Sequence, residues 1–98
     1  MDNQHRKISG YRELSQEEVD LMNRIKAKGA ELLALQAELA AALGKQHFDL
    51  AKMREAFDQA ELDRFVAAEP QRWAAIGKTD IQTGIMALVR AVAQPAGV

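Results

Sequence analysis

A helix start followed by a long apolar stripe constrains the fold of this chain more than any other feature. Ser15 and Glu18 match the S-x-x-E capping box, in which two residues satisfy each other's backbone amides at a helix start. Apolar side chains then recur at a spacing of three or four, which is typical of one helix face. They are Leu21, Ile25, Leu32, Leu35, Leu39 and Leu43, and Lys28 fills the one missing step between Ile25 and Leu32. The pattern predicts a helix over about residues 15–44 that stops at Gly44, because glycine is common just past a helix end.

The rest of the chain also shows helical patterns, divided by helix-breaking residues. Residues 1–14 are predicted to be an N-terminal arm, and residues 45–69 a second helix that returns antiparallel to the first after a turn at Gly44. Glu69-Pro70 breaks that pattern. Residues 70–95 form the C-terminal helical segment, with one or two turns to Gly77 and a last helix over about residues 80–93, where Thr79 and Gln82 match a second capping box. The predicted fold is all-α: a helical hairpin plus a C-terminal helix in one domain of residues 1–98.

The composition predicts a thin hydrophobic core. Hydrophobic residues make up 48% of the 98-residue chain, but many of them are alanine, which buries little area. Trp73 is expected to be a core anchor rather than a stacking surface for a ligand. A short helical chain of this kind gains core by association, so we expect a homo-oligomer.

Charge and motifs exclude several classes of function. The net charge of −1, from 13 Lys+Arg and 14 Asp+Glu, argues against a DNA partner, since nucleic-acid coats usually carry a basic excess. The sequence has no cysteine and no metal-binding or nucleotide-loop motif, so we expect no enzyme activity, no metal and no cofactor. We expect no signal peptide, because the first residues are polar, and no membrane partner, because no apolar run is long enough to span a membrane.

The residues best suited to hold a ligand lie between the arm and the first helix. Tyr11 offers an aromatic face that can stack on a base, which is worth about 1–3 kcal/mol. Lys26 borders the apolar stripe, and Lys28 occupies a position within it. Both lysines could instead lay their stems on apolar surface with the ammonium groups in water, and the arm could be a frayed terminus. The residues alone therefore leave a binding protein and a plain structural coiled-coil protein open.

Two long stretches resemble a known family. HRKISGYRELSQEEVDLMNRIKAKGAELLAL near the N-terminus and RWAAIGKTDIQTGIMALVRAVAQP near the C-terminus are similar to the small phage anti-CBASS proteins that act as cyclic-oligonucleotide sponges. The resemblance covers about residues 4–35 and 72–95, and it is much weaker over residues 45–69. It implies a compact helical homohexamer in the cytoplasm of the infected bacterial host. Such proteins bind cyclic dinucleotides, such as 3′,3′-cGAMP, and cyclic trinucleotides without cleaving them, which blocks CBASS antiphage immunity.

The resemblance also assigns roles to individual residues. A tyrosine in the YREL motif stacks on the bases and a lysine in the NRxK motif contacts the phosphates from another protomer; these correspond to Tyr11 and Lys26. A second pocket, for cyclic trinucleotides, corresponds to Arg72 and Lys28. The family has a threonine at the position of Lys28, and the lysine either strengthens phosphate binding or removes that pocket. The alternative function is a structural or regulatory helical oligomer without a nucleotide ligand.

Overall fold

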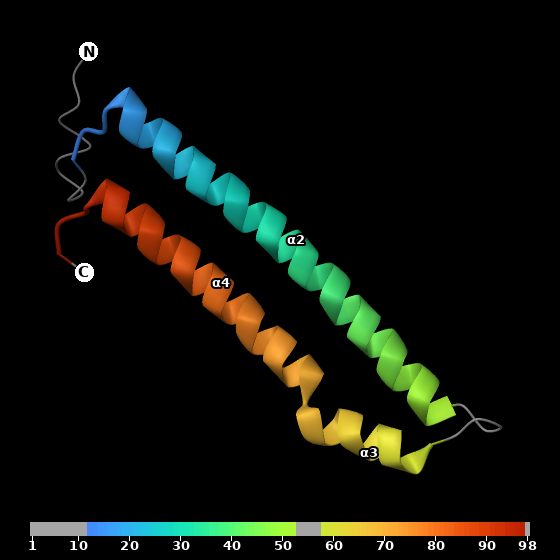
Figure 1. The fold of residues 1–98 in the computed structure, drawn as a ribbon. Coiled ribbons are helices and arrows are strands. Elements are labelled where there is room, and N and C mark those ends of the chain that lie inside the picture. Colours follow the sequence, from blue (N-terminus) through green and yellow to red (C-terminus); the bar gives the residue numbers. More distant parts are fainter. Residues whose placement is uncertain (1–11, 53–57, 98) are drawn as a thin grey trace. The chain divides into compact units, whose positions relative to one another are not determined.

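The computed structural model describes residues 12–52 and 58–97. These residues form α2 (Gln16–Lys52), α3 (Gln59–Ala68) and α4 (Pro70–Ala93), and the described ranges contain no strand (Figure 1). The prediction of an all-α fold with a helical hairpin and a C-terminal helix is therefore confirmed. None of the described helices combines the length and the hydropathy of a membrane span.

The capping box at the start of α2 forms as the sequence predicts. The backbone amide of Glu18 donates to Ser15 Oγ at 3.2 Å, and the backbone amide of Ser15 donates to Glu18 Oε1 at 3.0 Å. The first intrahelical bond, from the amide of Val19 to the carbonyl of Ser15, is 3.0 Å long. Two backbone donors that would otherwise lack helical partners are thus satisfied, and the start of α2 is fixed.

The predicted end of the first helix at Gly44 is wrong. α2 runs through Gly44 and ends at Lys52, so residues 45–52 continue it and do not begin a second helix. A glycine that ends a helix usually adopts a positive φ, and Gly44 does not. A helical glycine costs only roughly 1 kcal/mol relative to alanine, which a long helix tolerates. The helix predicted over residues 45–69 is accordingly reduced to α3, and residues 53–57 lie outside the described part of the chain.

The break at Glu69-Pro70 is confirmed, and the one predicted at Gly77 is wrong. α3 starts after Asp58, whose carboxylate accepts from the amide of Glu61 at 3.2 Å, and ends at Glu69 with a left-handed φ of 50°. α4 then begins at Pro70, a residue suited to the first helical position, and continues unbroken through Gly77. The hydroxyl of Thr79 donates to the carbonyl of Ala75 at 3.4 Å within α4, so Thr79 does not cap a new helix.

The chain divides into two compact units, and the division falls inside α2 and inside α4. Unit 1 contains the chain up to Glu31 and from Ile81 onward. The segments of α2 and α4 in unit 1 lie side by side (Figure 1), and Gly29 of α2 is buried. A Cβ placed on Gly29 would lie 2.7 Å from Ile85 Cγ1. The neighbour that leaves no room for a Cβ at this position is therefore the side chain of Ile85.

Unit 2 contains Leu32–Asp80 and is centred on Phe65, which is 3% exposed. The ring of Phe65 lies 5.4 Å from that of His47 on α2. Gln36 on α2 donates to the carbonyl of Ala74 on α4 at 3.0 Å, and Ala74 is buried. Trp73 is 59% exposed in this chain, so its predicted role as a core anchor is wrong.

The core is as thin as the composition predicts. Among the described residues only Gly29, Phe65 and Ala74 are buried. Nine large apolar side chains are exposed: Leu21, Leu32, Leu35, Leu39, Phe48, Val66, Trp73, Met86 and Leu88. Much of the apolar surface of the helices is therefore left uncovered by the chain itself.

Candidate ligand-binding site

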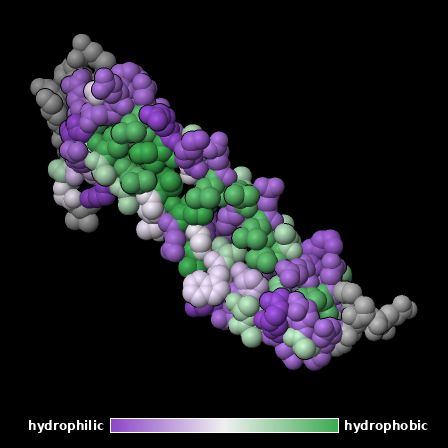
Figure 2. Space-filling model, viewed as in Figure 1, coloured by the Kyte–Doolittle hydropathy of each residue, from purple (hydrophilic) through white to green (hydrophobic). Residues whose placement is uncertain are grey.

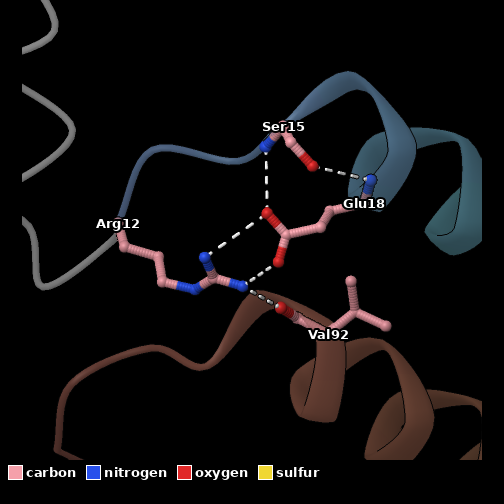
Figure 3. A network of polar contacts seen from close by, with 4 residues as sticks. All are labelled: Arg12, Ser15, Glu18 and Val92. Carbon is pink, nitrogen blue, oxygen red and sulfur yellow. Dashed lines mark hydrogen bonds and ion pairs between the residues drawn. The ribbon is translucent and has the colours of Figure 1, made fainter.

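The side chain of Arg12 contacts both the start of α2 and the end of α4 in unit 1 (Figure 3), an arrangement that we call the Arg12 clasp. Its guanidinium forms an ion pair with Glu18, the residue that closes the capping box. The same Nη2 atom donates to the carbonyl of Val92 at 2.8 Å, where the last turn of α4 leaves carbonyls without helical partners. One side chain thus fixes the segment that directly follows Tyr11 in the sequence against both helices of unit 1.

The clasp has a clear electrostatic consequence. The side-chain hydrogen bond from Arg12, followed by the backbone amide of Ser15, lowers the pKa of Glu18 from 4.5 to about 2. Hydrogen bonds to a carboxylate favour its charged form. Glu18 therefore stays ionised well below neutral pH, so its carboxylate holds Arg12 at the helix start at neutral and at mildly acidic pH.

Lys26 lines an apolar hollow in unit 1 that we call the Lys26 hollow. Its volume is about 320 Å³, and it lies between α2 and α4. The lining residues are Lys26, Ile85, Met86, Val89, Arg90 and Pro95. Lys26 forms no ion pair with any described residue, so its ammonium is available to a ligand. The hollow combines an apolar floor with two cations, one from each helix.

Lys28 lines a different hollow, the Lys28 hollow, of about 340 Å³ in the same unit. It is formed by Leu21, Arg24, Ile25, Ala27, Lys28, Ile85 and Leu88. Figure 2 shows apolar side chains gathered over the parts of α2 and α4 that belong to unit 1. The side chain of Lys28 is 82% exposed and pairs with Glu31 at 3.3 Å. Such an exposed pair is weak, so the ammonium of Lys28 can exchange Glu31 for another anion.

The remaining predicted site residues are placed elsewhere. Tyr11 lies outside the described residues. Arg72 belongs to unit 2, where it pairs with Glu69 at 3.7 Å and lies 5.2 Å from the centre of the Trp73 ring. The structure therefore brings Lys26 and Lys28 into one unit but into separate hollows, and it groups Arg72 with a different set of residues.

Sequence reasoning missed two arginines of unit 1, Arg12 and Arg90. Arg12 lies within the YREL motif and was available as a signal. Arg90 follows Met86 by one helical turn, so it shares the face that borders the Lys26 hollow. Arg90 could not have been paired with Lys26 from the sequence, because the two residues are far apart in the chain. No group of His, Asp and Glu side chains among the described residues has the arrangement of a metal site.

The helices and hollows together define a small helical protein whose apolar hollows are bordered by cations, and comparison with known proteins identifies its family. The chain belongs to the Acb2/Tad1 hairpin-domain family, whose model matches residues 5–93. It is 62% identical over 107 aligned residues to anti-CBASS protein 2 of Pseudomonas phage JBD67, and the alignment covers 99% of both chains. The resemblance carried by the two sequence motifs is thereby confirmed.

Proposed function

We propose that this protein binds and sequesters cyclic oligonucleotide second messengers, cyclic dinucleotides such as 3′,3′-cGAMP among them, without cleaving them. The observation that carries the proposal is the Lys26 hollow, where a lysine without an ion pair to any other described residue lines an apolar floor. A cyclic dinucleotide has the complementary chemistry, with flat bases joined by anionic phosphodiesters. Membership of the Acb2/Tad1 hairpin-domain family and the similarity to an anti-CBASS protein support the same reading.

Lys26 binds a phosphate of the messenger in this proposal. A charged hydrogen bond between an ammonium and a phosphate is strongest where apolar surroundings limit competing water. The side chains of Ile85, Met86 and Val89 supply such surroundings. Tyr11 stacks on a base, and this role remains a prediction from the resemblance.

The binding unit that we propose is a homo-oligomer, in the form of a hexamer. The exposed apolar side chains of the isolated chain support association, because the free energy falls when a second copy covers a stripe of leucines that otherwise faces water. The hexamer itself follows from the family resemblance. Tyr11 and Lys26 then come from different protomers, so assembly completes the site.

We further propose that Arg72 and Lys28 belong to a second pocket, for cyclic trinucleotides. Each side chain is exposed and forms a weak ion pair with a carboxylate three residues away in the sequence. Both can therefore turn to a phosphate at small cost.

Sequestration explains the biological effect that we propose. Inside the infected bacterial host, CBASS cyclases make these messengers, and removal of the free messenger leaves the effector inactive. The relative is an anti-CBASS protein of a phage, which supports this role for the present chain. Binding alone achieves the effect, so the proposal requires no catalytic residue.

Calorimetric titration with 3′,3′-cGAMP tests the proposal directly. We expect saturable binding at micromolar protein, together with recovery of intact nucleotide after heat denaturation. The proposal would be contradicted if the titration gave no binding heat and the ligand did not change the unfolding temperature. Recovery of linear nucleotide would identify a hydrolase instead.

Variants of the two principal residues locate the site. Tyr11→Ala and Lys26→Ala should abolish binding while the oligomer remains folded, since neither is a central stripe position. Lys78→Ala is the matched control, because Lys78 is an exposed lysine of unit 2. Native mass spectrometry with and without ligand gives the subunit number and the ligand stoichiometry together. If Lys26→Ala dissociates the assembly, Lys26 acts in assembly and not in ligand contact.

The alternative is a structural or regulatory helical oligomer without a nucleotide ligand. The exposed leucines of α2 favour it as strongly as they favour a binding oligomer. It predicts that Tyr11→Ala leaves function intact, so the same variant separates the two.

A further inference from the structure

We propose that Arg90 is a second phosphate-binding cation of the Lys26 hollow. The inference rests on the proposed function, and it adds a residue from the far end of the chain to that site. Lys26 lies on α2 and Arg90 lies on α4, and both line the same hollow within unit 1. The apolar side chains of Ile85, Met86 and Val89 belong to the same lining.

The charge balance of the hollow favours this role. Each phosphodiester of a cyclic dinucleotide carries one negative charge, so Lys26 alone balances half of the ligand's charge. No acidic side chain is among the described residues that line the hollow, and Arg90 forms no ion pair with any described carboxylate. Within the described part of the chain, Arg90 is therefore a cation without an anionic partner, in the lining of a site that needs one more cation.

A hydrogen bond to the backbone restrains the side chain of Arg90 in a position from which it can bind a phosphate. Its Nη2 atom donates to the carbonyl of Gly97 at 2.9 Å, which ties the chain after α4 to the helix. That chain segment includes Pro95, which lines the hollow. A guanidinium has several N–H donors arranged in a planar fork, so one bond to Gly97 leaves others for a phosphate. The tether restricts the rotamers of Arg90 before the ligand arrives and thus reduces the entropy lost on binding.

The hydrogen bond to Gly97 also suggests a competing role for Arg90, in which the side chain only holds the segment after α4 against the helix. Two uncharged variants distinguish the explanations. Arg90→Met keeps the length of the apolar stem and removes both the charge and the donors. Arg90→Gln removes the charge but retains an amide that can still donate to the carbonyl of Gly97. A tether role tolerates glutamine, whereas a phosphate-binding role tolerates neither variant.

The test is calorimetric titration of the full-length oligomer with 3′,3′-cGAMP, at low and at high salt. We expect both variants to bind roughly 10- to 100-fold more weakly than wild type, the range for loss of one charged hydrogen bond. Their affinity should also depend less on salt, because one screened charge pair is gone. Lys78→Met is the matched control on the same helix and should bind like wild type. Arg90→Gln with wild-type affinity would overturn the proposal.

A second readout uses the wild-type protein and does not depend on how the variants fold. In protein with ¹⁵N-labelled arginine, the side-chain Nε–Hε resonance of Arg90 should shift as 3′,3′-cGAMP is added, and that of Arg64 in unit 2 should not. An unchanged Arg90 resonance at saturating ligand also overturns the proposal. The failure of the proposed function looks different: wild type itself then gives no binding heat.

Discussion

Arg12 and Glu18 form the ion pair that joins the N-terminal segment to the start of α2, and the same guanidinium reaches the carbonyl of Val92 at the end of α4 (Figure 3). A local helix cap thereby becomes part of a contact between segments that are 80 residues apart. Arg12 directly follows Tyr11 in the chain, so the pair holds the residue next to Tyr11 against the start of α2.

The pKa of Glu18 should depend on Arg12. The hydrogen bond from Arg12 is the largest cause of the lowered value of about 2, so Arg12→Ala should move the pKa of Glu18 up toward 4.5. An NMR titration of the Glu18 carboxyl carbon measures the change. Arg24→Ala serves as the control, since Arg24 is an exposed arginine on the same helix. An unchanged titration in Arg12→Ala would show that the capping amide alone holds the carboxylate.

The free energy of unfolding should decrease as the pH falls from 4.5 toward 2, because Glu18 becomes protonated in this range. A carboxyl whose pKa is lowered by folding binds its proton more readily in the unfolded chain. Its contribution to the free energy of unfolding is therefore complete above pH 4.5 and is lost as the pH falls toward 2. Urea unfolding of wild type and Glu18→Gln measures it, since glutamine can still complete a capping box. The two proteins should differ at pH 6 and converge at pH 2; an equal difference at both pH values would contradict this.

Gly29→Ala should destabilise unit 1. The new methyl group would lie 2.7 Å from Ile85 Cγ1, too close for a real contact, so Ile85 or α4 must move. Overpacking of this kind costs about 1–3 kcal/mol and exceeds the gain of roughly 1 kcal/mol in helix propensity. Gly44→Ala is the control, because a Cβ at Gly44 meets nothing within 4 Å. Thermal unfolding should place the two variants on opposite sides of wild type.

Phe65→Ala should be the most damaging substitution in unit 2. Phe65 is 3% exposed, and truncation of a buried phenylalanine typically costs about 3–5 kcal/mol. Phe48→Ala removes the same side chain from a position that is 62% exposed, and we expect a much smaller loss. Denaturant unfolding of both variants gives the comparison. Equal losses would mean that a second copy of the chain covers Phe48.

Lys28 and Lys26 should differ in their effect on cyclic dinucleotides. They line separate hollows, so Lys28→Ala should bind 3′,3′-cGAMP much like wild type, whereas Lys26→Ala should not. Lys28→Thr introduces the residue that the family resemblance places at this position. Titration of each variant with a cyclic trinucleotide then shows whether Lys28 strengthens or blocks the second pocket. A large loss of dinucleotide binding in Lys28→Ala would argue that one ligand occupies both hollows.

Local patterns predicted two helix starts correctly, those at Ser15 and Pro70, whereas the starts expected near residues 45 and 80 are wrong. The capping box of Ser15 and Glu18 and the start of α4 at Pro70 depend on residues within one turn of each other, so the sequence contains all the partners. The helix ends were harder to predict. Gly44 and Gly77 suit a helix end and a helix interior almost equally, and the packing around them decides which one occurs.

By itself, the sequence determined the helical class of this protein, its thin core and the family to which it belongs, because periodicity, composition and long matching motifs are properties of the chain in order. The tertiary structure decided which cations share a surface. Arg12 reaches Val92, and Arg90 joins Lys26 at one hollow, across most of the length of the chain. Such pairs depend on how α2 and α4 approach each other at Gly29 and Ile85. That approach follows from side-chain packing between distant segments, which the spacing of residues along one helix does not specify.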